Sequence, residues 1–319
     1  MMTGALIIDK PAGITSHDVV ARVRKILGER RVGHTGTLDP FATGVLVVLV
    51  GRATRLAQFL SGAEKEYEAV IRLGYATDTG DATGKRIDGG TNITTETQRH
   101  TEVRGEEIGA ALASLRGEIE QTPPMYSAKK IAGKKLYELA RRGEEVERRP
   151  VRVTVKKFEA QTRGSSLLKH NEDGTCDLAV RVVCSAGTYV RSLAEAVGER
   201  LGAGAHLFEL RRTRAGEFKI EDAISLERLS ELSQSGTVEQ ALISADAALV
   251  HLPAVQLESD DLSRVQQGID LRVEDPEASR WSEGQRVRMR SANGDLIAVG
   301  VYNAAVKSIH PSVVIANRD

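Results

Sequence analysis

The side chain best placed to do chemistry is Asp39, the only acid of the segment 33–44, which reads Gly-His-Thr-Gly-Thr-Leu-Asp-Pro-Phe-Ala-Thr-Gly. Its glycines, threonines and proline predict a polar loop. The apolar run at residues 45–50 predicts a buried strand, although periodicity alone also allows a buried helix. We therefore expect Asp39 on a tight loop at the mouth of a core strand, where scaffolds present catalytic groups. The alternative is a turn-forming aspartate that only accepts hydrogen bonds from nearby amides.

The whole string of residues 33–44 is similar to the catalytic motif of the TruB family, bacterial tRNA pseudouridine synthases that act on the T-loop. Other segments resemble motifs of the same family, in the same order along the chain. These segments are Lys10–Ser16, Pro123–Ala128, Gly187–Ser192 and Gly204–Thr213. The resemblance covers most of residues 5–220, and it implies isomerisation of uridine to pseudouridine at the T-loop position conventionally numbered 55.

That reaction breaks the bond between ribose and the base nitrogen, turns the base and rejoins it through carbon. It involves no redox change and no energy input, so no cofactor is expected. The sequence agrees, because it has no P-loop, no dinucleotide-binding glycine pattern and no Cys/His metal cluster. The reaction needs a nucleophile or charge stabiliser that is ionised at neutral pH, and a free aspartate titrates near pH ~3.9. The family's nucleophile is the aspartate of this motif, here Asp39; whether it attacks the ribose or the base stays open.

The resemblance also implies the other site residues. A uridine inside a folded loop must be turned outward before it can be reached, and Tyr67 is the implied stacking partner of the flipped base, near the proton that leaves the base carbon. Arg191 is expected to pair with Asp39 and orient it through a bidentate contact. His34 is expected to hold the flipped nucleotide or to fill the space it leaves. The implied substrate-binding set is completed by Tyr189 and Leu210, which line the uracil pocket, and by Lys10 and Asp81.

Composition limits the remaining possibilities. The 319 residues suggest about two domains, and the zero formal net charge excludes a bulk polycation, so any RNA surface must come from local clustering. Two cysteines, Cys176 and Cys184, cannot form a disulfide framework and fit a reducing cytosol. The N-terminus shows no secretion signal, and no apolar run approaches the ~20 residues of a membrane span. We therefore expect a cytoplasmic monomer without a metal or a membrane contact.

The basic part of the chain is residues 122–163, which hold twelve Lys/Arg and five Glu, a net charge of +7. One interpretation is a solvated helix with ion pairs such as Glu138 to Arg142. The other is RNA contact, because clustered cations beside Tyr126 and Tyr137 suit phosphate binding and base stacking. Since the segment begins like the RNA-gripping thumb of TruB enzymes, we expect residues 122–150 to close on the T-stem and T-loop of tRNA.

The remaining patterns predict a mixed α/β (α+β) fold. A pseudouridine synthase catalytic domain with a largely antiparallel sheet is expected over residues 1–245. A small β-rich domain, similar to a PUA RNA-binding module, is expected over 250–319, where an Asn293-Gly294 turn predicts a hairpin. The polar, aperiodic residues 88–104 are interpreted as a surface insertion.

Local signals predict individual elements. Alternation predicts strands at residues 67–73, 151–158 and 178–184. Ser16 and Thr188 are expected to cap helices whose apolar faces begin at Val19 and Val190.

Two other functions fit parts of the sequence. A non-catalytic RNA-binding protein could use the same basic segment and terminal module, although the presence of Asp39 disfavours it. A glycosidase-like hydrolase could use Asp39 as nucleophile, but such enzymes usually need a second carboxylate about 5–9 Å away. Asp81 is the nearest candidate in the sequence for that carboxylate.

Overall fold

The computed structural model describes residues 2–87, 105–127, 130–131, 134–136, 142, 144, 146–162, 166–273 and 280–316. The predicted insertion at 88–104 lies outside these residues, as do Tyr137 and other parts of the predicted thumb. Within the described ranges, no helix is long and apolar enough to cross a membrane.

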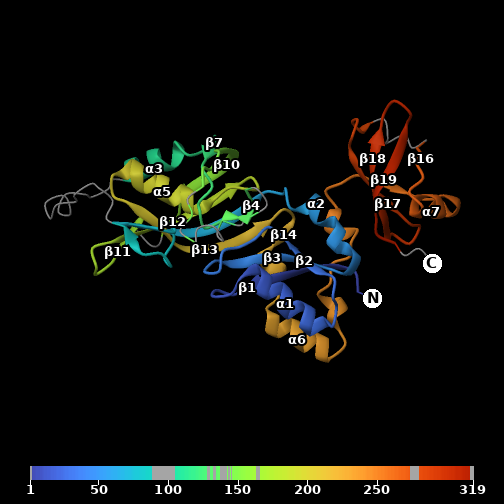
Figure 1. The fold of residues 1–319 in the computed structure, drawn as a ribbon, viewed down its shortest axis with the longest axis horizontal. Coiled ribbons are helices and arrows are strands. Elements are labelled where there is room, and N and C mark those ends of the chain that lie inside the picture. Colours follow the sequence, from blue (N-terminus) through green and yellow to red (C-terminus); the bar gives the residue numbers. More distant parts are fainter. Residues whose placement is uncertain are drawn as a thin grey trace.

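A large mixed sheet forms the body of the chain (Figure 1). In spatial order its strands are β1 (Gly4–Lys10), β3 (Thr43–Val50), β13 (Ala205–Ala215), β4 (Lys65–Leu73), β12 (Cys176–Cys184), β10 (Val151–Ala160) and β7 (Gly117–Gln121). Three short strands pair beside this path, namely β2 (Val32–Thr35), β11 (Leu168–His170) and β14 (Phe218–Lys219). Every pairing in this sheet is antiparallel except that of β13 with β3. The predicted largely antiparallel α+β fold is confirmed.

Burial explains the two strand patterns in the sequence. Strand β3 is apolar throughout because both of its faces are covered: Val45 and Val47 join one apolar cluster, while Leu46 and Val48 join another. Strand β4 alternates because Tyr67 and its even-spaced neighbours face a third cluster, whereas the residues between them face the opposite side of the sheet.

Helices cover the sheet in two places (Figure 1). Helices α3 (Gly105–Ala113) and α5 (Val190–Leu201) pack on the face that carries Tyr67. Helices α1 (Ser16–Leu27) and α6 (Leu226–Gln234) pack together beneath β1 and β3. The buried face of α6 is a stripe of leucines at helical spacing, Leu226, Leu229 and Leu232.

Both predicted helix caps were wrong by one position. The N-cap of α1 is Thr15, whose hydroxyl accepts from the backbone N–H of Asp18, while the Asp18 carboxylate accepts from the backbone N–H of Thr15. Ser16 instead turns inward, where its Oγ donates to the Leu38 carbonyl and accepts from the Leu38 N–H. The N-cap of α5 is Tyr189, which makes no side-chain cap. Serine and threonine compete for capping positions, and sequence alone does not rank neighbours.

The remaining short elements connect these layers. They are η1 (Gly51–Leu56), α2 (Ala57–Leu60), β5 (Ala76–Thr77), β6 (Arg86–Ile87), β8 (Lys130–Ile131), β9 (Lys134–Lys135), η3 (Ile220–Asp222), η4 (Val238–Gln240) and η5 (Ala247–Leu249).

A separate β-rich domain follows, as predicted (Figure 1). Its sheet has the order β15 (Ala254–Gln256), β17 (Arg286–Arg290), β18 (Leu296–Asn303), β19 (Ser308–Val314) and β16 (Leu271–Arg272), with helix α7 (Ser259–Gln266) beside it. The predicted hairpin joins β17 and β18, and Gly294 adopts the positive φ of 84° that its turn needs.

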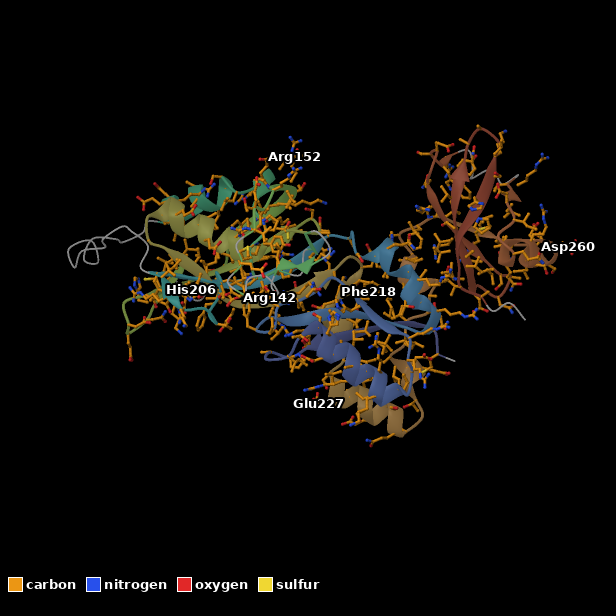
Figure 2. All side chains as sticks on the ribbon, viewed as in Figure 1. Arg142, Arg152, His206, Phe218, Glu227 and Asp260 are labelled. Carbon is orange, nitrogen blue, oxygen red and sulfur yellow. The ribbon has the colours of Figure 1, made fainter. Side chains whose placement is uncertain are left out.

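The two parts of the chain share one apolar cluster. Phe218, labelled in Figure 2, and Leu249 pack with Leu296, Val299 and Val313 of the second sheet. Arg55 on η1 donates to the Val314 carbonyl at 2.6 Å, so backbone acceptors at the end of β19 are held from the first part of the chain.

Candidate active site

The Asp39 loop is fixed from below by a buried lysine. The Lys10 side chain has no solvent exposure, and its Nζ donates to the carbonyl oxygens of Ala42 at 2.7 Å, Pro11 at 2.9 Å and Pro40 at 3.1 Å. Burial lowers the pKa of Lys10 to about 8, against the pull of the nearby Asp39 carboxylate. This ammonium therefore ties the end of strand β1 to the part of the loop that directly follows Asp39.

Gly44 lets the loop enter β3 next to β13. Its φ is +100°, and a Cβ at this position would lie 2.2 Å from the carbonyl oxygen of Arg212. Only glycine fits both the backbone conformation and the close approach. The glycine that ends the predicted catalytic motif therefore has a packing reason.

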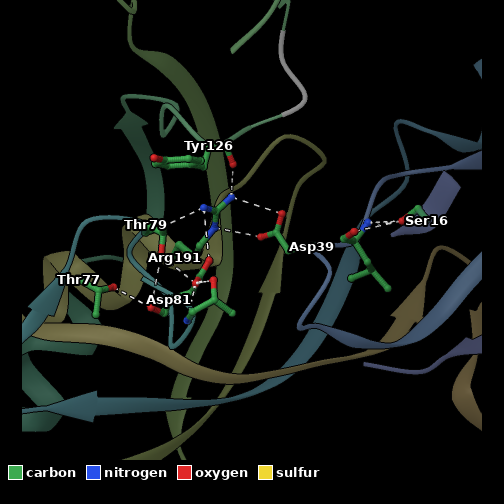
Figure 3. A network of polar contacts seen from close by, with 9 residues as sticks. Ser16, Asp39, Thr77, Thr79, Asp81, Tyr126 and Arg191 are labelled. Carbon is green, nitrogen blue, oxygen red and sulfur yellow. Dashed lines mark hydrogen bonds and ion pairs between the residues drawn. The ribbon is translucent and has the colours of Figure 1, made fainter. Parts of the chain in front are cut away.

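Asp39 and Arg191 form a two-bond ion pair (Figure 3). Nε of Arg191 lies 3.0 Å from Oδ2 of Asp39, and Nη2 donates to Oδ1 at 3.4 Å. The arginine side chain is 4% exposed and the aspartate side chain 32%, so the carboxylate keeps an open side while the guanidinium is covered. The fold thus brings together the two side chains predicted to pair, from residues 152 positions apart.

Other groups surround the same guanidinium (Figure 3). Nη1 donates to the Thr79 carbonyl at 3.0 Å and lies 3.7 Å from Oδ2 of Asp81, while Nη2 donates to the Tyr126 carbonyl at 2.7 Å. Asp81 is itself buried, and its Oδ1 accepts from the Thr79 hydroxyl at 2.9 Å. Arg191 is therefore oriented from several sides before any ligand arrives.

The pKa of Asp39 is set by opposing influences. Burial raises it above the ordinary value for an aspartate, the Arg191 guanidinium lowers it, and the Asp81 carboxylate raises it again, with a net upward shift. A carboxylate in a desolvated site with a raised pKa is a better nucleophile or base than one in water, provided that it stays ionised. The arginine supplies that condition.

A cavity of about 240 Å³ opens beside Asp39, and we call it the Tyr67 cavity. Tyr67 on β4 and Leu210 on β13 lie on its lining, and both side chains are buried. Tyr189 also lines it, and the amide of Gln121 both accepts from the Tyr189 N–H and donates to its carbonyl. The structure thus places the predicted aromatic, aliphatic and Tyr189 groups around one hollow next to the ion pair.

A larger cavity of about 790 Å³ lies on the other side of Asp39, and we call it the His34 cavity. His34 and His17 line it with their rings 5.6 Å apart, edge to face. Burial, followed by the positive charges of His17 and Arg212, lowers the pKa of His34 to about 4, so its imidazole is neutral at pH 7. Nδ1 of His34 is buried and has no hydrogen-bond partner among the described protein atoms. The described fold therefore leaves this nitrogen unsatisfied at the lining of the cavity.

Two cations of the Tyr67 cavity were missed by sequence reasoning. Arg212 is 1% exposed, and its guanidinium donates to the carbonyls of Val45 at 2.7 Å and Gly36 at 3.0 Å. Lys65 donates to the Ser61 carbonyl at 2.6 Å, and burial lowers its pKa to about 8. Arg212 lies two residues after Leu210 in the predicted motif, so strand alternation could have placed it on the same face.

The Lys10 and Asp81 side chains are placed differently from the other predicted substrate-binding residues. Lys10 lies beneath the loop, outside both cavities, whereas Asp81 lines the His34 cavity. Their roles toward a substrate stay predictions. No group of three or more potential metal ligands occurs within the described part of the chain.

The fold and the site combine a mixed sheet with an aspartate–arginine pair beside an aromatic cavity. Comparisons with known proteins identify the class of enzyme that has this arrangement. Residues 24–190 match the family model "TruB family pseudouridylate synthase (N terminal domain)", and residues 191–250 match "tRNA pseudouridylate synthase B C-terminal domain". The chain belongs to the TruB family of pseudouridylate synthases, as its motifs predicted.

Individual relatives agree with the family match. The chain is 47% identical over 272 residues to the tRNA pseudouridine synthase B of Geobacillus thermodenitrificans, an alignment covering 85% of this chain and 86% of that protein. It is 39% identical to the Bacillus pumilus protein of the same name, over 100% of this chain and 99% of that one. Among solved structures, a chain of a Cbf5-Nop10-Gar1 complex aligns with a TM-score of 0.72 and 29% identity, over 99% of this chain and 86% of that chain.

Proposed function

We propose that this protein isomerises uridine to pseudouridine in the T-loop of tRNA, at the position conventionally numbered 55, with Asp39 as the catalytic carboxylate. The observation that carries the proposal is the partly exposed carboxylate of Asp39, which lies on the lining of the Tyr67 cavity and is paired with the nearly buried Arg191. Membership of the TruB family and the tRNA-acting names of the relatives support the same reaction.

The geometry assigns a role to each group around the carboxylate. The Tyr67 cavity takes the uracil of an everted nucleotide, with Tyr67 and Leu210 against its ring and Tyr189 at its edge. The His34 cavity takes the neighbouring part of the RNA loop, because its neutral imidazole offers an unpartnered nitrogen and a flat face. Asp39 stands between the two, where the sugar joins the base.

The burial of Tyr67 favours a neutral side chain beside the base. Desolvation raises the pKa of the Tyr67 phenol, so the hydroxyl keeps its proton at neutral pH. A protonated phenol stacks on the base and donates a hydrogen bond without carrying charge, which favours a role in holding uracil.

RNA contact outside the cavities falls to two further parts. The predicted thumb, residues 122–150, begins where the Tyr126 carbonyl binds Arg191, so its base lies at the ion pair. Arg152 follows the thumb on β10 and extends into solvent (Figure 2), with its side chain 81% exposed. The β-rich domain from 250 to 319 would act as a PUA-like module on a more distant part of the same tRNA.

A hydrolase with Asp39 and Asp81 as its paired carboxylates is disfavoured. Asp81 is 5% exposed, and its Oδ1 accepts from the Thr83 N–H at 2.9 Å and from the Thr83 hydroxyl at 2.6 Å. A general acid must carry a proton, whereas this oxygen is occupied by donors. Asp81 thus acts as a support for Arg191.

The test is a T-loop minihelix assayed for pseudouridine by carbodiimide modification and primer extension. We expect the wild type to form pseudouridine and Asp39→Asn to lose turnover by at least about 10³-fold, because an amide is neither nucleophile nor base. The same variant should bind the minihelix as the wild type does, since the substitution removes no phosphate contact. Turnover by Asp39→Asn near the wild-type rate would end the assignment, and release of free uracil would favour the hydrolase.

A further inference from the structure

Ser127 carries a buried hydroxyl that makes no hydrogen bond within the described part of the chain. The residue is 4% exposed, and its Oγ has no hydrogen-bond partner among the described protein atoms. Leaving a buried polar atom unpaired is unfavourable, so such atoms normally have a structural or functional reason.

The position of Ser127 supplies the reason. The Tyr67 cavity and the His34 cavity have five lining residues in common, and Ser127 is one of them. The others are Thr37, Leu38, Asp39 and Arg191. Ser127 therefore borders the same junction as the catalytic carboxylate, and a ligand that extends from one cavity into the other must pass it.

The backbone before Ser127 is held in place. The carbonyl of Tyr126 accepts from Nη2 of Arg191 at 2.7 Å, and Arg148 donates to the Pro123 carbonyl at 3.1 Å. Two consecutive prolines, Pro123 and Pro124, restrict the chain further. Ser127 is thus held at the junction by a segment tied to the same arginine that orients Asp39.

We propose that Ser127 is a substrate-contact residue whose hydroxyl binds the ribose 2′-hydroxyl of the target nucleotide. The proposal rests on the proposed function, which puts the bond between sugar and base beside Asp39. The carbon that bears the 2′-hydroxyl is bonded to the anomeric carbon, so that hydroxyl also lies at the junction. Both hydroxyls can donate and accept, and the 2′-hydroxyl is the group by which a protein distinguishes RNA from DNA.

Ser127 and the 2′-hydroxyl can be tested as a pair in the Asp39→Asn background, where the RNA is bound without being converted. The dissociation constant is measured by fluorescence anisotropy for T-loop minihelices carrying uridine, 2′-deoxyuridine or 2-thiouridine at the target position. We expect Ser127→Ala to weaken the uridine RNA by about 3- to 10-fold, the range of one neutral hydrogen bond. The deoxy substitution should cost a similar factor with Ser127 present and almost none with alanine there.

A matched control is Ser61→Ala. Ser61 also lines the Tyr67 cavity, and the substitution likewise removes one hydroxyl. The Ser61 Oγ already donates to the Ala57 carbonyl at 2.6 Å, so its loss and the deoxy substitution should act independently. Ser127→Thr keeps the hydroxyl and should keep the discrimination against the deoxy RNA. Circular dichroism and thermal unfolding check that each variant is folded.

The outcomes separate this proposal from the function on which it rests. The proposal would be overturned if Ser127→Ala and the 2′-deoxy substitution weakened RNA binding independently of each other. It would also be overturned if the effect of Ser127→Ala depended only on the 2-thio substitution, because Ser127 would then contact the base. The carbodiimide assay on the wild type tests the reaction itself, so failure of the reaction and failure of the serine contact give different results.

Discussion

At the scale of single residues, Arg191 determines what Asp39 can do. Its Nη2 is shared between the Tyr126 carbonyl at 2.7 Å and Oδ1 of Asp39 at 3.4 Å, so the thumb base takes the shorter of the two bonds. A charge-assisted bond strengthens as it shortens. Movement of Tyr126 on RNA binding would leave Nη2 of Arg191 to the Asp39 carboxylate alone. Such a movement would link the predicted thumb to the proposed catalytic carboxylate.

Removal of the arginine should change the pH dependence of the reaction. Under the proposed function activity needs ionised Asp39, so the rate should fall as pH drops through the pKa of that carboxyl, which burial already raises. Arg191 lowers this pKa, and Arg191→Met should therefore move the acidic limb of the single-turnover rate to higher pH. Part of the activity lost at neutral pH should return in alkaline buffer.

Two further variants test whether the charge and its position matter. Arg191→Lys keeps a cation but loses the planar guanidinium that can bind a carboxylate through two donors. The acidic limb of its pH–rate profile should therefore lie between those of the wild type and Arg191→Met. Arg211→Met removes an arginine that pairs with Asp9 at 2.7 Å and lines neither cavity, so its limb should match the wild type. An acidic limb that does not move in Arg191→Met would mean that another group titrates.

Sequence reasoning found the residues that motifs mark, and it missed those that register alone brings together. Asp39 and Arg191 were predicted to pair because each belongs to a long motif. Arg212 was missed although it lies in such a motif, because its role depends on β13 running parallel to β3 with Arg212 opposite Gly44. Ser127 was missed because nothing local distinguishes a serine with a partner from one without.

At the scale of elements, the first strand supports the catalytic loop. Lys10 ends β1, pairs in register with Gly44, and donates to two carbonyls within the loop, those of Pro40 and Ala42. The strands themselves were predictable, because burial on one face leaves alternation in the sequence of β4 and burial on both faces leaves a continuous apolar run in β3. The one-residue errors at the helix caps show that neighbouring polar residues compete for a terminus, and packing decides between them.

Replacing that lysine should destabilise the protein in a pH-dependent manner. Lys10→Met leaves carbonyls without their donor, and we expect a loss of about 1–3 kcal/mol in the free energy of unfolding near pH 7. The folded pKa of Lys10 is about 8 and its ordinary value is 10.5, so between these values the unfolded chain binds more protons. Wild-type stability therefore rises with pH across this window relative to the variant.

Urea unfolding of both proteins at several pH values between 7 and 10.5 measures this difference. Parallel stability curves would show that the lysine is not a buried cation in the folded protein. Lys10→Arg should restore little, because a guanidinium is larger than the space in which the fully buried ammonium meets its carbonyls.

At the scale of the whole molecule, a buried ion pair joins the two domains. Asp246 precedes η5 in the segment that links them, and its Oδ2 lies 2.8 Å from Nη1 of Arg288 on β17. The arginine side chain is 9% exposed and also donates to the Leu252 carbonyl at 3.0 Å. Arg290 lies 3.7 Å from the same carboxylate. The β-rich domain is therefore held by charge as well as by the shared apolar cluster.

Asp246→Ala should leave the Arg288 guanidinium buried without its counter-ion. Breaking a buried pair from one side typically costs about 3–5 kcal/mol, and the two remaining carbonyl acceptors, those of Leu252 and of residue 246 itself, place the expected loss near the lower end. Because the pair lies where the domains meet, the β-rich domain should unfold or detach first, which limited proteolysis near residue 250 and urea unfolding would both detect. Asp261→Ala is the matched control, since its partner Arg264 is 53% exposed and such pairs contribute only about 0–1 kcal/mol. Equal losses in the two variants would show that the Asp246 pair does not couple the domains, and the placement of a PUA-like module relative to the active site would then depend on the apolar cluster alone.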